Sequence, residues 1–255
     1  MFQKKSLGQN FLKSKKVIAD IVRAGNILAG ETVLEAGPGE GILTAALLEA
    51  GAKVVAVEKD QRLIPFLQQR FSNEISIGKL IIIHADILNY ELGIMNHEYK
   101  VVANIPYYIT GAFIRKFLES GNRPFRMVLL LQKEVVERIV AKDGKESVLS
   151  ISVKAYGEPR YIETVKAGNF SPAPKVDSAI LAIENISKQF FAGFSEERFF
   201  NLVKTGFAHK RKMLTGNLKK LDNDIENALI SLNISPNARA EDLSLNEWRK
   251  IVLES

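Results

Sequence analysis

Residues 33–41 have the sequence Val-Leu-Glu-Ala-Gly-Pro-Gly-Glu-Gly, and this stretch decides the fold. Residues 32–35 predict a short buried strand, and residues 42–50 predict a helix that Gly51 ends. A glycine-rich turn between a strand and a helix lets a ligand approach the bare backbone of Gly37 and Gly39. The same glycines can also serve only as a tight structural turn, so the surrounding residues have to decide.

Strands and helices alternate along the chain around this turn. An amphipathic helix is predicted at 15–24, with Ser14 as its N-cap. Further strands are predicted at 53–58, 80–84, 101–103 and 127–131, and further helices at 62–71 and 112–119. Such alternation predicts right-handed βαβ units and a mostly parallel sheet, an α/β fold of the Rossmann-like type.

The pattern changes toward the C-terminus. Residues 132–156 fit neither period well, and we interpret them as helical. Two more strands, at 160–167 and 178–184, flank a proline-containing loop. Beyond about 186 the sequence predicts only short helices, at 196–207, 210–221, 223–232 and 244–253. We therefore predict two domains, an α/β domain over 1–185 and a small all-helical domain over 186–255.

Composition excludes several classes of protein. The 255 residues are 46% hydrophobic and 25% charged, which is typical of a globular chain. No apolar run reaches the 18 or so residues that a membrane-spanning helix needs, and the Lys-rich start lacks the apolar core of a secretion signal. The absence of cysteine excludes disulfides and thiolate metal sites, and three scattered histidines make no convincing metal site. We expect a cytoplasmic protein without a metal centre.

The net charge of +6 is concentrated in two segments. Residues 1–30 hold six basic residues against one acidic residue. Residues 204–220 hold six basic residues, among them Lys210, Arg211 and Lys212, and no acidic residue. Either run could be a solvated helix face. Two such runs beside a nucleotide-type site favour binding of RNA.

Two carboxylates are expected at the same edge of the sheet as the glycine turn. Glu58 ends the second strand of the sheet, about 20 residues after the turn, where a carboxylate can bind both hydroxyls of a ribose. Asp86 follows the third strand and can accept a hydrogen bond from an adenine amino group. Glu35 and Glu40 add negative charge that disfavours a pyrophosphate and suits an ammonium and a sulfonium. These features favour S-adenosylmethionine as the cofactor.

Residues 104–107, Asn-Ile-Pro-Tyr, are the most specific feature of the chain. They match the pattern of methyltransferases that modify the exocyclic amine of a nucleobase. The side-chain oxygen of Asn104 and the carbonyl of Ile105 can accept the two amine protons, and Pro106 fixes the turn that directs them. Tyr107 offers a ring for stacking of the target base.

A base inside a duplex cannot reach such a site, so the target must be extruded or already unpaired. Phe170, in the proline-rich loop of residues 169–175, is our candidate for a second stacking wall. A single phenylalanine more often belongs to a hydrophobic core.

These motifs together resemble the ribosomal RNA adenine dimethyltransferases, and most closely the bacterial small-subunit (16S) dimethyladenosine transferase family. The resemblance spans nearly the whole chain. The segments that carry it are Leu7–Leu12, Glu35–Thr44, Glu58, Ala85–Asp86, Asn104–Tyr108, Gln132–Val135, Phe170–Ser178, Phe207–Lys212 and Arg239–Ser244.

The resemblance implies a role for several residues. The cofactor site would contain Asn10, Leu12, Gly37, Gly39, Glu58, Asp86 and Asn104, while Tyr107 and Phe170 would sandwich the target adenine. The implied activity is transfer of two methyl groups to each of two adjacent adenosines in a hairpin loop near the 3′ end of 16S rRNA. Unpaired bases are what proteins recognise best in RNA. The implied partner is the small-subunit precursor, and we expect a monomer.

Other interpretations remain open at this point. The 23S rRNA dimethyltransferases of the antibiotic-resistance type share the turn and the 104–107 motif, but Tyr108 and the helical C-terminal segment favour the small-subunit type. A non-catalytic assembly factor would not need Asn104 or the two carboxylates. A dehydrogenase would need a pyrophosphate-friendly turn. One departure from the family pattern is His209, where arginine is usual.

Overall fold

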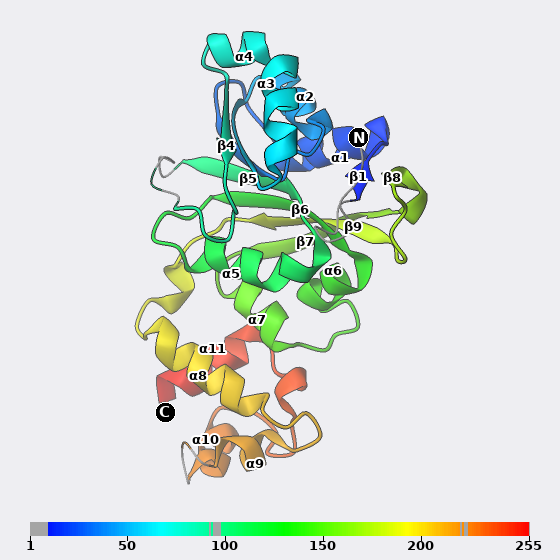
Figure 1. Ribbon diagram of the computed structural model, residues 1–255. Helices are drawn as coiled ribbons and strands as arrows, with labels where there is room; N and C mark the ends of the chain where they lie inside the picture. Colours follow the sequence, from blue (N-terminus) through cyan, green and yellow to red (C-terminus); the bar gives the residue numbers. More distant parts are fainter. Residues whose placement is uncertain (1–9, 92, 94–97, 220, 222–223, 255) are drawn as a thin grey trace. The chain divides into compact units, whose positions relative to one another are not determined.

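The computed structural model describes residues 10–91, 93, 98–219, 221 and 224–254 (Figure 1). Residues Leu7–Gln9 of the family resemblance lie outside this range. So do four residues that were counted above among the basic residues and the histidines, namely Lys4, Lys5, Lys220 and His97. The chain divides into two compact units, of which the first comprises Met1–Val136 and Glu158–Ile186 and the second Glu137–Gly157 and Ser187–Ser255. In the described part of the chain, no helix has the length and apolarity that crossing a membrane requires.

The first unit is built on a seven-stranded sheet in the order β4-β3-β2-β5-β6-β9-β7. Five neighbouring strands are parallel, whereas β9 runs antiparallel to both β6 and β7. The strands are β2 (Thr32–Ala36), β3 (Lys53–Glu58), β4 (Leu80–His84), β5 (Tyr99–Asn104), β6 (Arg126–Gln132), β7 (Glu158–Val165) and β9 (Ser178–Glu184). The expected α/β fold with a mostly parallel sheet is confirmed.

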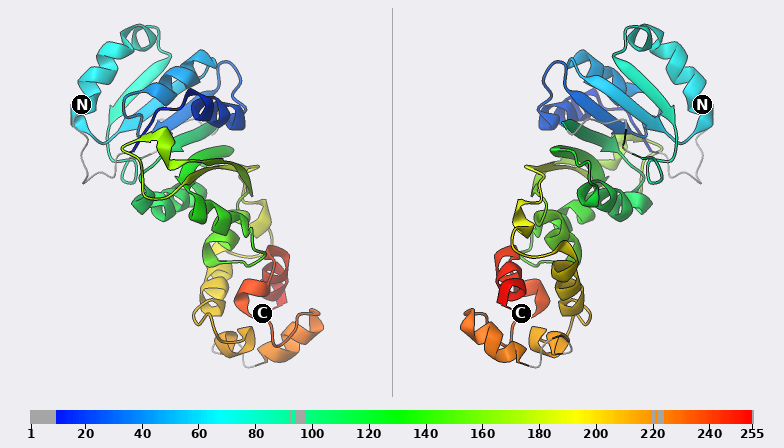
Figure 2. Two further views of the ribbon diagram at one scale, coloured as in Figure 1. Left: turned by 90° about the vertical axis from the view of Figure 1, so that its right-hand side faces the viewer. Right: turned by 90° about the vertical axis from the view of Figure 1, so that its left-hand side faces the viewer.

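Helices cover both faces of this sheet, with α1, α2 and α3 on one face and α5 on the other (Figures 1 and 2). The helices of this unit are α1 (Lys15–Gly25), α2 (Ile42–Glu49), α3 (Ile64–Arg70), α4 (Ser72–Ser76) and α5 (Thr110–Glu119). Because both faces are covered, the central strands are buried along their whole length, as in Arg126–Gln132, where the five inner residues are fully buried. The predicted cap is also present, since the Ser14 side chain accepts a hydrogen bond from the Val17 backbone.

A second, two-stranded sheet was not expected from the sequence. It pairs β1 (Phe11–Leu12) with β8 (Phe170–Ser171), which are antiparallel, so that Leu12 lies opposite Phe170. Strands of two residues are too short to show a periodic pattern, which is why the sequence does not reveal them. The pairing brings the start of the described chain to the proline-rich loop.

The second unit contains only helices among its described residues (Figure 2). They are α7 (Val148–Lys154), α8 (Glu196–Gly206), α9 (Leu214–Leu218), α10 (Ile225–Ser231) and α11 (Leu245–Glu254), while α6 (Lys133–Val140) begins in the first unit. The fully buried Trp248 stacks on Phe207, and a cluster of phenylalanines around Phe199 lies in the same unit beside buried aliphatic residues such as Leu214.

Two details differ from the sequence-based expectations. Residues 137–157 belong to the helical unit, although the predicted boundary near 185 placed them in the α/β domain. The helix expected at 210–221 is reduced to Leu214–Leu218, so the basic residues 210–212 lie in a loop. The buried Asn217 stabilises that loop, because its amide nitrogen donates to the carbonyls of Gly206 (2.6 Å) and His209 (3.2 Å).

Candidate active site

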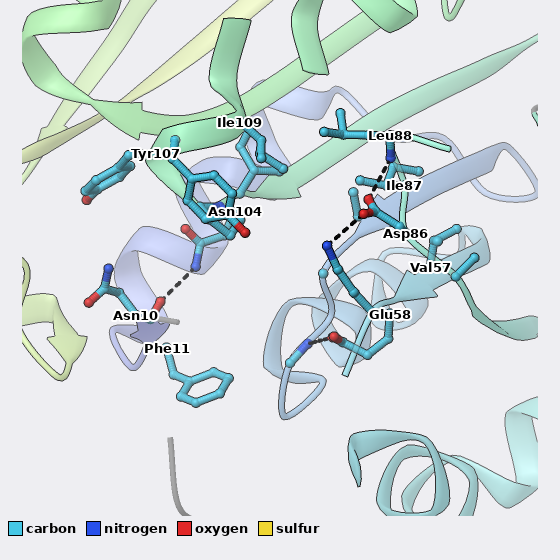
Figure 3. A pocket seen from close by; sticks show the side chains of 18 residues that line it. Asn10, Phe11, Val57, Glu58, Asp86, Ile87, Leu88, Asn104, Tyr107 and Ile109 are labelled. Carbon is cyan, nitrogen blue, oxygen red and sulfur yellow. Dashed lines mark hydrogen bonds and ion pairs between the residues drawn. The ribbon is translucent and has the colours of Figure 1, made fainter. Parts of the chain in front are cut away.

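A cavity of about 180 Å³ lies at the carboxyl ends of β2, β3 and β5 (Figure 3). The chain order of the strands reverses between β2 and β5, and open α/β sheets bind ligands at such a point. Three segments supply most of the lining, namely the glycine turn, the ends of β3 and β4 with the residues that follow, and the loop after β5. The lining residues are Asn10, Phe11, Ala36, Gly37, Gly39, Val57–Lys59, Ala85–Leu88 and Asn104–Ile109.

The glycine turn forms one wall of this cavity. Gly37 and Gly39 have φ angles of 70° and 59°, a region that side-chain-bearing residues rarely adopt. A Cβ atom at Gly39 would come within 2.8 Å of the Phe11 ring. The backbone conformation of the turn therefore favours glycine at both positions. At Gly39 a side chain would also collide with the Phe11 ring.

Glu58 is held in a fixed orientation at the end of β3. One carboxylate oxygen accepts the backbone N–H of Gly39 at 3.0 Å, and the other accepts that of Asp60 at 2.8 Å. Burial raises the pKa of Glu58, and these hydrogen bonds partly offset the rise. Each carboxylate oxygen has a further lone pair, so Glu58 can still accept hydrogen bonds from a ligand in the cavity.

Asp86 lies beside Glu58 on the same wall and forms an ion pair with Lys59 at 2.7 Å (Figure 3). Its second oxygen accepts the backbone N–H of Leu88 at 3.0 Å. The Lys59 hydrogen bond, followed by the Leu88 hydrogen bond, holds the pKa of Asp86 below its usual value. The carboxyl group is therefore ionised at neutral pH and acts only as an acceptor.

Glu35 lies under the glycine turn and lines a smaller pocket that adjoins the main cavity. Its side chain is fully buried and accepts a hydrogen bond from the Thr44 hydroxyl at 2.6 Å. Burial raises the pKa of Glu35 to about 8, and the nearby Glu58 carboxylate adds to the rise. Glu35 thus carries a proton at neutral pH, so the negative charge that we expected at the turn comes from Glu40 rather than from Glu35.

The loop after β5 forms the opposite wall, where Asn104 faces Asn10 (Figure 3). The side-chain nitrogen of Asn104 donates to the Asn10 carbonyl at 3.2 Å, which leaves the side-chain oxygen of Asn104 available to a ligand. Tyr107 lies nearby, and its hydroxyl is hydrogen-bonded to the Ser178 hydroxyl of β9 at 2.7 Å. This wall therefore presents an amide acceptor next to an anchored aromatic ring.

Most of the residues expected in the site come together in this one cavity. Those present are Asn10, Gly37, Gly39, Glu58, Asp86, Asn104, Ile105, Pro106 and Tyr107. Several lining residues were missed, notably Phe11, Lys59 and Tyr108. Lys59 directly follows Glu58 and Tyr108 follows Tyr107, so adjacency to the two motifs was the available signal.

Two expected residues do not line the main cavity. Phe170 is only 5% exposed and packs in the hydrophobic core of the first unit, which corrects the expectation that its ring faces the cavity. Leu12 belongs to the same core and reaches only the smaller pocket near Glu35. The physical reason is the pairing of β1 with β8, which places these two apolar side chains opposite each other in the interior.

The expected RNA-binding residues Lys210, Arg211 and Lys212 are all exposed. They follow α8 in the second unit, in the loop held by Asn217. Within the described residues, none of the three forms an ion pair, so their charges face solvent.

A comparison with known families identifies the chain. The model of the ribosomal RNA adenine dimethylase family matches residues 2–255. The chain belongs to this family. The match includes the glycine turn, the two carboxylates and the 104–107 motif, and the fold and cavity described above are those of a Rossmann-like methyltransferase.

Several named proteins are similar to this chain over nearly its full length. A ribosomal RNA small subunit methyltransferase A of Dehalococcoides mccartyi is 41% identical, over 98% of this chain and 88% of that protein. The crystal structure of the 23S rRNA methyltransferase ErmE has a TM-score of 0.81 and 27% identity, over 96% of this chain and 99% of the other. A dimethyladenosine transferase from Plasmodium falciparum has a TM-score of 0.80 and 27% identity, over 96% of each chain.

Proposed function

We propose that this protein uses S-adenosylmethionine to dimethylate the exocyclic amines of two adjacent adenosines in a hairpin loop near the 3′ end of 16S rRNA. The observation that carries the proposal is the cavity in which Asn104 and Tyr107 face Glu58 and Asp86. One wall has acceptors suited to an adenosine, and the other has the acceptor and the ring suited to a target base. The site thus has places for a cofactor and a nucleobase side by side.

The residues of the first wall fit the adenosine part of S-adenosylmethionine. Glu58 would bind the ribose hydroxyls through its remaining lone pairs, and Asp86, an acceptor only, would take the adenine amino group. Ile87 and Leu88 offer apolar surface for the purine ring. The bare backbone at Gly37 and Gly39, together with Asn10, would line the methionine end.

When bound, S-adenosylmethionine supplies a methyl group on a sulfonium that is already a good leaving group. The protein's own task is to present the amine nitrogen, whose lone pair is otherwise delocalised into the adenine ring. The Asn104 side-chain oxygen and the Ile105 carbonyl would accept the two amine protons and favour a pyramidal nitrogen. Alignment of this kind can contribute about 7–11 kcal/mol to catalysis in good cases.

Tyr107 would stack on the extruded target adenine, a contact that contributes about 1–3 kcal/mol per base. Because the Tyr107 hydroxyl is anchored to Ser178, the ring needs little reordering when the base arrives. Phe170 would act from the core, by supporting the loop from below rather than by stacking. Lys210, Arg211 and Lys212 would bind RNA phosphates at a distance from the chemistry.

The small-subunit RNA is the favoured substrate because the most similar of the named relatives carries that name at 41% identity, against 27% for the 23S enzyme. Tyr108 supports the same choice, whereas the helical second unit does not discriminate, because the match to ErmE covers 96% of this chain. We further propose that the protein acts as a monomer in the cytoplasm, where ribosomal subunits of bacteria are assembled.

The test is methyl transfer to unmethylated small ribosomal subunits and, separately, to 23S rRNA, mapped to the nucleotide by mass spectrometry. The expected product is dimethyladenosine at two adjacent positions of a small-subunit hairpin loop. Asn104→Ala should lower kcat by at least about 100-fold, the size of effect that loss of an aligned polar group produces, while S-adenosylhomocysteine still binds. Transfer to 23S rRNA alone, or an unchanged rate in the variant, would contradict the proposal.

A further inference from the structure

Tyr108 stands out among the exposed side chains of the first unit. Of the large apolar and aromatic side chains that are exposed in residues 10–91, 93, 98–219, 221 and 224–254, it has the highest exposed fraction, 67%. It also lines the cavity, directly after Tyr107. An aromatic ring that is exposed in the lining of a cavity is available for stacking on a base.

The two tyrosines serve different parts of the cavity. They are consecutive in the 3₁₀ turn Tyr107–Ile109, in which successive side chains diverge by about 120°. Tyr107 is half-buried and directs its hydroxyl to Ser178. Tyr108 instead is exposed while it also lines the cavity. Its ring therefore lies where the cavity opens to solvent.

We propose that Tyr108 is a second base-stacking surface, which holds the RNA base next to the target adenosine. This inference rests on the function proposed above. Methylation of two adjacent adenosines requires that one base enters the cavity while its neighbour stays outside, deprived of its own stacking partner. Tyr107 and Tyr108 are only about 3.8 Å apart at their Cα atoms, so the two rings can receive two consecutive bases.

The exposed side chain of Tyr108 is suited to stacking on a base. Its hydroxyl makes no hydrogen bond with another described residue, so its ring is not fixed to the rest of the fold as the ring of Tyr107 is. An aromatic ring accepts any base by its face, which is useful when the neighbour is an adenosine before or after methylation.

The test compares Tyr108→Leu, which removes the ring at similar size, with Tyr108→Phe, which keeps it. Phe66→Leu is the matched control, because Phe66 is an exposed aromatic residue on α3 outside the cavity lining. Two RNA hairpins serve as substrates. One contains the two adjacent adenosines, and in the other an abasic nucleotide replaces one of them. KM, kcat and the Kd of S-adenosylhomocysteine are measured for each protein.

On the adjacent-adenosine hairpin, Tyr108→Leu should raise KM about tenfold, equivalent to ~1.4 kcal/mol, within the range of one base stack. Its kcat and its Kd for S-adenosylhomocysteine should stay within about twofold of wild type. Tyr108→Phe should restore most of the affinity. On the abasic hairpin, the variants and the wild type should have similar KM values, because the base that Tyr108 contacts is missing.

Three results would overturn the inference. They are an unchanged KM on the adjacent-adenosine hairpin, an equal rise of KM on both hairpins, and a loss confined to S-adenosylhomocysteine binding, which would mean that the ring covers the cofactor. A wild-type protein that methylates neither the hairpins nor unmethylated small subunits would instead refute the proposed function itself.

Discussion

At the scale of single residues, the site depends on where each carboxyl group is buried. Glu35, Glu58 and Asp86 lie within one region of the first unit, yet burial raises the pKa of the first two and Lys59 lowers that of the third. The sequence shows three acidic residues near strand ends and cannot separate them, because desolvation depends on the packing around each group. Of the three, only Asp86 has a pKa that its surroundings lower.

Glu58→Gln should weaken binding of S-adenosylhomocysteine. A charged acceptor for the ribose hydroxyls is lost, and hydrogen bonds to charged groups contribute about 1.5–3 kcal/mol, so an increase in Kd of roughly 10- to 150-fold is expected. Isothermal titration calorimetry measures the change. Glu49→Gln, an exposed residue of α2, is the control and should bind as the wild type does. Equal affinities of Glu58→Gln and wild type would exclude Glu58 from ribose recognition.

Glu35→Gln should change how stability depends on pH. The unfolded chain releases the Glu35 proton near pH 4.5, whereas the folded protein keeps it until about pH 8. Between these values, the free energy of unfolding of the wild type should fall as pH rises, by up to ~1.4 kcal/mol for each pH unit, relative to the variant. Below pH 4.5 the relative stability of the two proteins should be constant.

Urea unfolding of both proteins at several pH values between 4 and 9 tests this prediction. The glutamine keeps an acceptor for the Thr44 hydroxyl. The difference between wild type and variant therefore reports the titration of the Glu35 carboxyl group. A difference in stability that does not vary with pH would show that Glu35 has an ordinary pKa and is reached by water.

At the scale of secondary-structure elements, prediction from sequence succeeds where burial imposes a regular pattern. The strands β2, β3 and β6 are covered on both faces and therefore appear as continuous apolar runs. The Ser14 cap of α1 is equally visible. The site residues on these strand ends were predictable for the same reason, since parallel strands place their carboxyl ends at one edge of the sheet.

Prediction from sequence fails where contacts between residues far apart in the chain determine the structure. The helical interpretation of residues 132–156 is confirmed by α6 and α7, but the membership of residues 137–157 in the helical unit was not predicted. It involves a contact far along the chain, in which the Glu146 backbone N–H donates to the Glu241 carbonyl. Phe170 packs in the core because β8 pairs with β1. Neither contact leaves a periodic signal in the sequence, so the membership of 137–157 in the helical unit and the burial of Phe170 needed the structure.

Gly206→Ala should destabilise the helical unit. A Cβ atom at Gly206 would lie 2.3 Å from the Trp248 ring, which is fully buried and cannot move aside without disturbing the core. Overpacking of this kind costs about 1–3 kcal/mol. Gly216→Ala is the control, because nothing lies within 4 Å of its added methyl group and alanine favours the helix α9. Thermal unfolding that is equally affected by both substitutions would argue against the close contact.

At the scale of the whole molecule, the two units would divide the proposed chemistry and the proposed RNA binding between them. The cavity with its acceptors lies entirely in the first unit, and the exposed basic loop lies in the second. Such a division separates the recognition of one base from the neutralisation of phosphates, which carry most of the affinity for RNA but little sequence information.

Replacing Lys210, Arg211 and Lys212 with glutamine should weaken RNA binding and reduce its dependence on salt. The slope of log Kd against log salt concentration should fall by about two units, because each lost phosphate contact removes roughly 0.7–0.9. Filter-binding or fluorescence titrations at several salt concentrations measure it. Lys53 and Lys79, two exposed lysines at the opposite strand ends, provide the control double substitution. An unchanged slope in the triple variant would mean that this loop is only a solvated surface.

The most direct measurement is a crystal structure of the protein with S-adenosylmethionine or a stable analogue bound. We expect the ribose hydroxyls at Glu58, the adenine amino group at Asp86 and the sulfur beside the side chain of Asn104. Electron density for the compound elsewhere on the protein, or a sulfur atom too far from Asn104 for its methyl group to meet a base held there, would contradict the proposed chemistry.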